Sequence, residues 1–142
     1  MRRAFCEMGT FVTEVEVEDL GVACLRYEND AVGIVEGASC YFGGSGEAEI
    51  VLLGEKGQVR FGLWDGKCAV YLREAAAGLP AREWVTREFA GQPLVKLYQE
   101  FAAAVREGKE PPITGQDGRK ALEIVLAIYR SAETRRPVWL PL

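Results

Sequence analysis

The chain has 142 residues, of which 49% are hydrophobic and 27% are charged, and its formal net charge is -4. This composition is typical of one globular domain spanning residues 1–142 and excludes an intrinsically disordered chain. The acidic balance argues against a nucleic-acid partner, because no stripe of Lys and Arg is available to release counterions from phosphates. No apolar run approaches the ~20 residues of a membrane span, and no apolar segment follows Met1-Arg2-Arg3 as in a signal peptide. We therefore expect a cytoplasmic protein with no membrane partner.

The first ninety or so residues predict strands separated by turns. Residues 10–18 alternate apolar and acidic side chains, and residues 20–27 are apolar on both faces. Asn29-Asp30 can supply the positive φ of a tight hairpin, and Asp65-Gly66 is a strong hairpin signal. The predicted strands are 10–18, 20–27, 31–38, 49–53, 59–63, 67–72 and 82–89.

A helix is predicted after Pro93, which suits a first helical turn. Its apolar residues recur at helical spacing, and Gly108 provides a cap that tolerates left-handed backbone. The predicted buried stripe consists of Leu94, Leu97, Phe101 and Val105.

A second helix is predicted after Pro111 and Pro112. Thr114 followed by Asp117 resembles a capping box at its N-terminus. Pro137 ends this helix, and residues 138–140 form a short terminal strand. The side chains expected to pack on the sheet are Leu122, Val125, Ile128 and Tyr129.

Strands followed by helices predict the α+β class. We expect a largely antiparallel or mixed open-faced sheet of about six to eight strands, with two C-terminal helices on one face. The other face has no helix left to cover it. If that face is apolar, a partner outside this chain must cover it.

Cysteine and histidine usage argues against metal and nucleophile sites. Cys6, Cys24, Cys40 and Cys68 show no close pairing, and the chain contains no histidine. A zinc site is therefore disfavoured, and Cys24 and Cys68 are interpreted as small buried residues on strands. Without histidine, Ser/His and Cys/His catalysis cannot be built within one chain.

Three acidic residues offer one alternative chemistry. Glu14, Glu16 and Glu18 would share a face of the predicted strand 10–18, a spacing compatible with glycosidase-like or metal-binding carboxylates. A solvated strand face explains the same pattern, and we favour it.

Two glycine-rich segments and the tryptophans are interpreted structurally. Residues 44–49 and 62–67 carry fragments of nucleotide-binding patterns, but a strand instead of a helix follows each one. Trp64, Trp84 and Trp139 could form a sugar platform, although core or interface anchors explain such large side chains better.

Three segments, taken together, resemble a known family. Residues 17–29 read VEDLGVACLRYEN, and residues 50–57 read IVLLGEKG. The third segment begins with TGQDG at residues 114–118 and continues with ALE at 121–123, YRSA at 129–132 and RPV at 136–138. They resemble the patterns VEDxAxxLLRFENGAxG, IEIxGxKG and TGEDGxxALExxxAxYxSAxxGRPV. In this order they are similar to the C-terminal half of the Gfo/Idh/MocA oxidoreductases, a family of NAD(P)-dependent sugar and inositol dehydrogenases.

The resemblance implies an α+β domain whose loops help to form a substrate pocket and whose exposed sheet face commonly makes a dimer. It also implies an N-terminal Rossmann domain, a catalytic lysine in a Glu-Lys-Pro motif and a catalytic histidine, all preceding the matched region. This sequence has no histidine and no Rossmann unit. Lys56 follows a glutamate but precedes Gly57, so it does not belong to a Glu-Lys-Pro motif. Asp30 and Arg135 stand where the family pattern has glycine.

The predicted function is that of a C-terminal domain of an NAD(P)-dependent sugar or polyol oxidoreductase. We expect it to shape the substrate pocket and to form a homo-oligomer through the uncovered sheet face. Alone it should hold no metal, bind no dinucleotide and transfer no hydride. Tyr41, Gly43, Gly44 and Ser45 are the predicted substrate contacts, because they lie in an accessible, backbone-rich loop.

Two other functions remain open at this point. One is a stand-alone, non-catalytic dimeric interaction or sugar-binding module of the same fold. The other is a carboxylate hydrolase that uses Glu14 and Glu16.

Overall fold

The computed structural model describes residues 1–41, 48–63, 66–88 and 93–142. They divide into two compact units, the first formed by Met1–Gly46 with Glu100–Leu142 and the second by Glu47–Gln99. The elements in chain order are β1 (Arg3–Gly9), β2 (Leu20–Arg26), β3 (Val32–Ala38), β4 (Glu49–Gly54), β5 (Gly57–Gly62), β6 (Lys67–Leu72), β7 (Trp84–Glu88), α1 (Pro93–Glu107), α2 (Gly115–Thr134) and β8 (Val138–Trp139).

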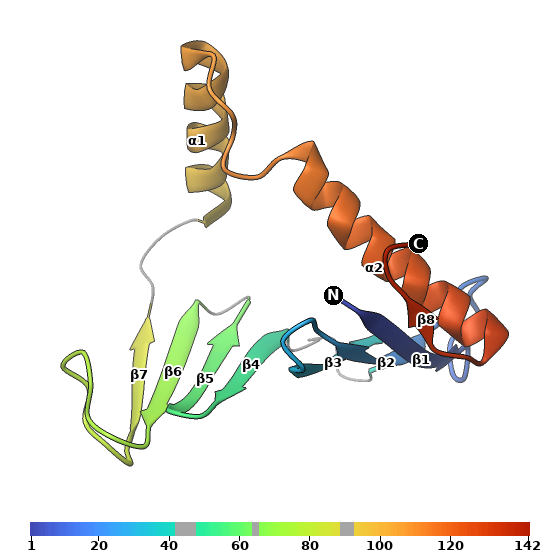
Figure 1. The fold of residues 1–142 in the computed structure, drawn as a ribbon, viewed down its shortest axis with the longest axis horizontal. Helices are drawn as coiled ribbons and strands as arrows, with labels where there is room; N and C mark the ends of the chain where they lie inside the picture. The colour runs from blue at the N-terminus through green and yellow to red at the C-terminus, as the bar shows by residue number, and fades with distance from the viewer. Residues whose placement is uncertain (42–47, 64–65, 89–92) are drawn as a thin grey trace. The chain divides into compact units, whose positions relative to one another are not determined.

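The predicted α+β class is confirmed, and the eight strands within the described residues form two open sheets. The first sheet has the order β3-β2-β1-β8 and the second the order β4-β5-β6-β7, with every neighbouring pair antiparallel (Figure 1). The second sheet is thus a simple meander, whereas β8 returns from the far end of the chain to pair with β1.

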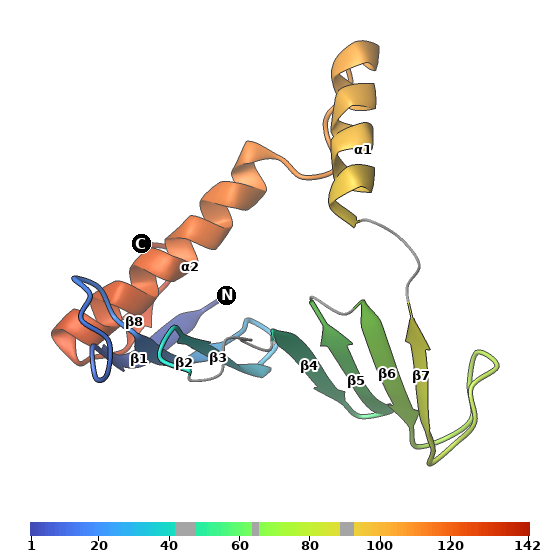
Figure 2. The same ribbon diagram turned by 180° about the vertical axis from the view of Figure 1, so that it is seen from behind.

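The core of the first unit lies between α2 and one face of the first sheet (Figure 2). β1 and β2 contribute Ala4, Cys6, Ala23 and Leu25, which face Ala127 of α2, and all five side chains are buried. Three of these five are alanines, so the helix backbone can approach the sheet closely. This core is thin, and we expect Leu25, its largest member, to dominate its packing energy.

The prediction of a strand at residues 10–18 is wrong. The structure places a strand earlier, at Arg3–Gly9, and residues 10–18 form an irregular loop. The physical reason is the buried carboxylate of Asp19, which accepts hydrogen bonds from three successive backbone N–H groups of the loop. Those N–H groups are therefore not available to a sheet ladder.

The predicted buried stripe of α2 is only partly correct. Ile128 packs against the core as expected, but Leu122 is 58% exposed, and Val125 and Tyr129 are exposed as well. The helix carries two apolar stripes, and the one with the smaller residues faces the sheet because it allows the closer approach. The residues of this stripe are Ile124, Ala127, Ile128, Ser131 and Ala132.

The predicted buried stripe of α1 is wrong at three of its four positions, and Leu97 is half-buried. Leu94, Phe101 and Val105 are exposed, whereas Ala104 is buried. The helical period was predicted correctly, and Gly108 with φ of 63° provides the expected left-handed end. Periodicity identifies the apolar side of a helix but not whether another element covers that side.

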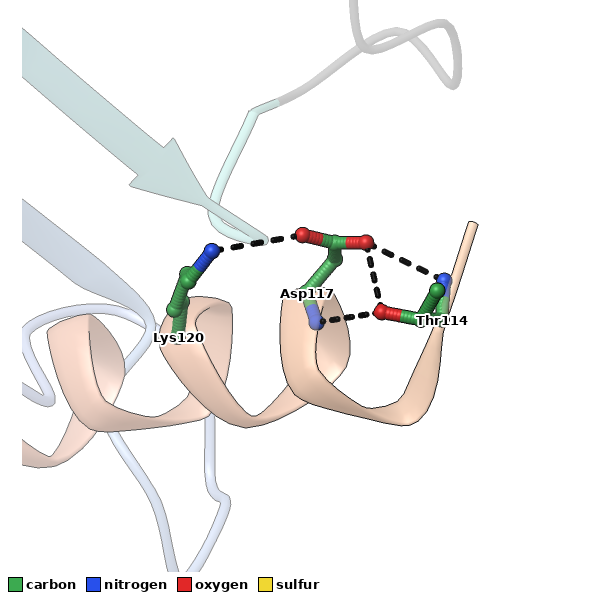
Figure 3. A network of polar contacts seen from close by, with 3 residues as sticks. All are labelled: Thr114, Asp117 and Lys120. Carbon is green, nitrogen blue, oxygen red and sulfur yellow. Dashed lines mark hydrogen bonds and ion pairs between the residues drawn. The ribbon is translucent and has the colours of Figure 1, made fainter. Parts of the chain in front are cut away.

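The start of α2 is confirmed in detail. Thr114 is the N-cap, its Oγ1 accepts a hydrogen bond from the backbone N–H of Asp117, and the Asp117 carboxylate accepts one from the backbone N–H of Thr114 (Figure 3). Lys120 adds an ion pair to Asp117 at 3.5 Å. This reciprocal capping holds the pKa of Asp117 below its usual value, chiefly through the hydrogen bonds from Thr114.

The two positions where the sequence lacks the family's glycine both adopt left-handed backbone. Asp30 has φ of 62° in the β2–β3 turn, as predicted for this hairpin. Arg135 has φ of 54° at the C-cap of α2. An L-residue pays a steric cost in this region that glycine does not pay.

The second sheet is held together by its turns and its registers. Glu55 and Lys56 form the tight turn between β4 and β5. A Cβ atom on Gly57 would lie 2.2 Å from the carbonyl oxygen of Tyr71, so no other residue fits there without moving the backbone. Ile50 and Leu52 pair with Phe61 and Val59, which gives this sheet one strongly apolar face.

The interpretation of the cysteines needs correction. Cys6, which was not assigned to the core, is buried, whereas Cys24 on β2 is exposed and Cys68 on β6 is partly buried. Cys24 pairs with Phe5 in the sheet register and therefore points to the face opposite α2.

Candidate functional site

The first unit contains a groove of about 350 Å³ between α2 and the first sheet. Its floor is made largely of small residues of β2 and β3, and one wall is the exposed stripe of α2. The lining residues are Cys6, Met8, Glu18, Asp19, Gly21, Ala23, Val35, Gly37, Ala38, Ser39, Val125, Ile128 and Tyr129.

Asp19 lies at one end of this groove and organises the loop that precedes it. Its side chain is 1% exposed and accepts hydrogen bonds from the backbone N–H groups of Phe11, Val12 and Thr13, at 2.9, 2.7 and 2.8 Å, and from the Thr13 hydroxyl at 2.9 Å. These donors, the Thr13 N–H foremost, hold the pKa of Asp19 far below its usual value. A carboxylate that accepts four hydrogen bonds from one loop is an anchor for that loop.

Glu18, the next residue toward the N-terminus, connects the loop to α2. Its carboxylate accepts a hydrogen bond of 2.6 Å from the hydroxyl of Tyr129. This contact lowers the pKa of Glu18 and raises the pKa of Tyr129, because it stabilises the carboxylate and the protonated phenol. The pair closes one side of the groove.

Ser131 ties α2 to β1 and to the segment that follows the helix. It is fully buried, its Oγ accepts a hydrogen bond from the backbone N–H of Cys6 at 3.1 Å, and it donates one to the carbonyl oxygen of Arg136 at 2.8 Å. Burial raises the pKa of the neighbouring Cys6 thiol. The hydroxyl therefore fixes the position of α2 between β1 and the segment that leads into β8.

Of the four predicted substrate contacts, the structure describes Tyr41. Tyr41 is exposed and donates a hydrogen bond to the Glu36 carboxylate, which raises the pKa of the tyrosine. Gly43, Gly44 and Ser45 lie outside the described residues.

The interpretation of Glu14, Glu16 and Glu18 as carboxylates on one strand face is wrong, because these residues belong to the loop anchored by Asp19. Glu14 and Glu16 are exposed, and Glu18 is bound to Tyr129. The basis of the carboxylate-hydrolase hypothesis is therefore lost.

The two described tryptophans belong to different units. Trp84 stacks obliquely on Tyr71 in the second unit, and Trp139 lies in the first unit below the guanidinium groups of Arg2 and Arg3. Trp64 lies outside the described residues.

Within the ranges that the structure describes, no group of three His, Cys, Asp or Glu residues is placed to hold a metal ion. In the same ranges, no helix is both long and apolar enough to cross a membrane.

A family model described as "Oxidoreductase family, C-terminal alpha/beta domain", that of the Gfo/Idh/MocA proteins, matches residues 6–140. The chain belongs to the Gfo/Idh/MocA oxidoreductase family. A comparison with curated protein sequences found no match.

Solved structures of oxidoreductases share the fold of this Gfo/Idh/MocA chain. The WlbA dehydrogenase from Bordetella pertussis, in complex with NADH and UDP-GlcNAcA, is 30% identical with a TM-score of 0.72, and the match covers 99% of this chain and 39% of that one. The aldose-aldose oxidoreductase from Caulobacter crescentus, complexed with glycerol, is 24% identical with a TM-score of 0.79, covering 98% and 41%. The oxidoreductase domain protein from Kribbella flavida is 18% identical with a TM-score of 0.82, covering 99% and 44%. The chain thus spans well under half the length of these structures.

The Gfo/Idh/MocA sequence patterns in this chain coincide with its structural contacts. Glu18 and Asp19 of the VED segment bind Tyr129 and the loop, Ser131 of the YRSA segment links α2 to β1, and Gly57 ends the turn of the EKG segment. Sequence reasoning treated these residues as family markers without assigning them a role. The signal for Asp19 was available, because a carboxylate just before a strand can cap a preceding loop.

Proposed function

We propose that this chain is the C-terminal domain of an NAD(P)-dependent oxidoreductase that acts on a sugar or polyol. In the complete enzyme the domain shapes the substrate pocket and mediates oligomerisation, while a Rossmann domain outside residues 1–142 binds the dinucleotide. We place the enzyme in the cytoplasm. The observation that carries the proposal is the match of the family's C-terminal model to residues 6–140.

The contacts of the family-pattern residues support this division of labour. Asp19, Ser131 and the Glu18–Tyr129 pair all serve to hold a loop, a helix and a sheet together. Lys56 lies in the β4–β5 turn, where its carbonyl oxygen accepts a hydrogen bond from the backbone N–H of Arg73. Since the chain also has no histidine, it offers no obvious acid–base partner for hydride transfer.

Dinucleotide binding tests the proposal directly. We expect no heat of binding when NADH or NADPH is titrated into the 142-residue chain, and no dehydrogenase activity with glucose, inositol or glycerol. In the positive control, the Rossmann domain of another family member is fused to this chain, and NADH binding by the fused protein is measured. Saturable NADH binding by the 142-residue chain alone would overturn the assignment.

Oligomerisation is proposed through the uncovered face, defined here as the face of the first sheet opposite α2. The strand registers place three rows on it: a basic row of Arg3 and Arg26 that also holds Trp139 and Val32, an apolar row of Phe5, Cys24 and Ile34, and an acidic row of Glu7 and Glu36 that also holds Val22. Ile34 is 76% exposed, and Phe5 and Cys24 are exposed as well.

This row pattern is self-complementary. A two-fold axis that runs across the strands along the apolar row would place the apolar rows of two copies together. It would also reverse the strand direction, so that Arg3 of each copy lies over Glu7 of the other, and Arg26 lies one strand away from Glu36 of the other. A two-fold interface must be complementary to itself, and an apolar centre with a charged rim is typical of one.

Replacing Ile34 tests this interface. We expect Ile34→Asp to convert the dimer into a monomer by light scattering, because it buries an unpaired charge at the centre of the contact. Leu53→Asp is the matched control, since Leu53 is 78% exposed but lies on the second sheet. A wild-type chain that stays monomeric at high concentration would refute the interface.

Charge reversal tests the orientation of the two copies. Glu7→Arg with Glu36→Arg should weaken the dimer, and adding Arg3→Glu with Arg26→Glu should restore it, because the four changes together exchange the two rows. If the fourfold variant associates no better than the double variant, the rows do not face each other.

A second candidate function is a non-catalytic dimeric interaction or sugar-binding module of the same fold. The apolar row on the uncovered face favours it as much as the first, since both require association. The two differ in whether a Rossmann domain completes the chain, so restored NADH binding in the fused protein supports the first. Saturable glucose or inositol binding by the 142-residue chain alone, without NADH, supports the second.

A further inference from the structure

A hollow of about 600 Å³ lies at the end of α2 next to the edge strand β8, entirely within the first unit. Its lining residues are Arg130, Thr134, Arg136, Pro137, Val138 and Trp139. No carboxylate is among them, so two guanidinium groups face an otherwise neutral wall. This volume is within the range of small-molecule sites, which is roughly 300–1,000 Å³.

The backbone that carries these residues is firmly held. The buried Ser131 hydroxyl donates a hydrogen bond to the carbonyl oxygen of Arg136. Val138 and Trp139 pair with Ala4 and Arg3 of β1, and the N–H of Leu140 donates to the carbonyl oxygen of Arg2. Pro137 further restricts the segment. A ligand at this position would therefore meet a preorganised frame, which lowers the entropic cost of binding.

The positive charge in the hollow is not neutralised by the protein. Among the residues that the structure describes, the ion pairs leave both Arg130 and Arg136 without a carboxylate. Two more guanidinium groups lie close by, because Arg2 and Arg3 are 5.4 and 5.6 Å from the ring centroid of Trp139. Of these two, Arg2 is paired with Asp30 at 3.8 Å. A cluster of this kind is notable in a chain whose net charge is -4.

We propose that this hollow binds the phosphate groups of a small phosphorylated ligand. Arginine offers a planar fork of donors that matches phosphate oxygens, and two forks on one frame suit a diphosphate better than a single carboxylate. Trp139 is 55% exposed and, with Pro137 and Val138, adds an apolar wall on which a sugar or a base can lie. The same diphosphate chemistry occurs free in solution and in nucleoside diphosphates.

Titration calorimetry with inorganic pyrophosphate, UDP and uridine tests the proposal on the 142-residue chain. We expect both diphosphates to bind and uridine not to bind. Tighter binding of UDP than of pyrophosphate would show that the ligand is a nucleoside diphosphate whose base or sugar contacts the apolar wall. Equal affinities would show that the ligand is free diphosphate. The proposal is overturned if neither diphosphate binds at millimolar concentration, or if uridine binds as well as UDP.

Matched arginine variants locate the site. The double variant Arg130→Gln/Arg136→Gln should weaken diphosphate binding by about tenfold or more, because it removes charge-assisted hydrogen bonds. Arg119→Gln, an exposed arginine near the other end of α2, should leave the affinity unchanged. All three side chains are exposed, so the variants should keep the thermal unfolding profile of the wild type. A double variant that folds and binds pyrophosphate as tightly as the wild type would refute the site.

Discussion

In the unit formed by Met1–Gly46 and Glu100–Leu142, α2 closes one face of the first sheet over a small core. In the Glu47–Gln99 unit, by contrast, none of the residues that the structure describes is buried. β4 shows the difference most clearly, since all six of its residues are exposed. The first unit therefore has a core of its own, whereas the second has an apolar sheet face without one.

The two units also differ in how polar groups are used. In the first unit, the buried Asp19 and Ser131 each satisfy several backbone groups and connect segments far apart in the sequence. The second unit is held by neighbouring hairpins and by a glycine at a crowded turn. Long-range contacts make folding cooperative, so we expect the first unit to resist opening better than the second.

The largest expected effect is in the core of the first sheet. Leu25→Ala should destabilise the first unit by about 2–5 kcal/mol, because Leu25 is its largest buried side chain. Hydrogen exchange read by mass spectrometry measures this, since peptides from the two units report separately.

Leu53→Ala is the control for Leu25→Ala. Leu53 is 78% exposed, so the change should alter stability by no more than about 0.5 kcal/mol. A cost as large as that of Leu25→Ala would mean that the face of the second sheet that carries Leu53 is covered in solution, and the contrast between the two units would not hold.

The second largest effect concerns the hydroxyl that links α2 to β1. Ser131→Ala should destabilise the first unit by about 1–3 kcal/mol, because it leaves the buried N–H of Cys6 without its acceptor. Thr134→Ala is the control, since that exposed hydroxyl only donates to the Arg130 carbonyl within the same helix. Urea unfolding of the two variants compares them. Equal midpoints would show that the link does not hold the helix in place.

Much of the fold was predictable because its signals are local. Thr114 and Asp117 define a helix start within four residues, and Asp30 tolerates the left-handed backbone that its hairpin needs. Most strand positions followed from alternation and turn residues. The strand at Arg3–Gly9 was missed, and the loop after it was read as a strand, because the deciding contact is the Asp19 carboxylate several residues away.

The buried surfaces of the helices were harder to predict for a different reason. α2 carries two apolar stripes, and hydrophobicity favours the one with Leu122 and Val125. The structure buries Ala127 and Ser131 instead, because short side chains let the helix approach the sheet. The candidate site could not be predicted from local patterns either, because the Glu18–Tyr129 contact joins residues 111 positions apart in the sequence.

A pH-dependent effect of intermediate size is expected at Asp19. Its folded-state pKa is depressed, so its contribution to stability is complete above the unfolded-state value of about 3.9 and is lost as the pH falls below that value. Asp19→Asn should therefore destabilise the first unit at pH 7, and the difference from wild type should shrink as the pH is lowered toward 2. The asparagine keeps one acceptor oxygen, which moderates the loss.

Urea unfolding at a series of pH values measures this difference. Asp117→Asn is a useful comparison, because its pKa is depressed as well but its carboxylate is exposed at a helix start. If the difference in free energy of unfolding between wild type and Asp19→Asn stays constant down to pH 2, the role assigned to the carboxylate charge is contradicted.

The smallest expected effect is a gain at the C-terminal end of α2. Arg135 has φ of 54°, and glycine adopts this backbone without the steric cost of a Cβ atom. Arg135→Gly should therefore stabilise the first unit by about 0.5–1 kcal/mol, after allowing for the extra freedom of glycine in the unfolded chain. Arg135→Gln separates the backbone effect from the loss of charge, because it removes the charge and keeps the Cβ atom. If both variants shift the urea midpoint equally, the gain comes from electrostatics in this arginine-rich corner and not from the left-handed cap.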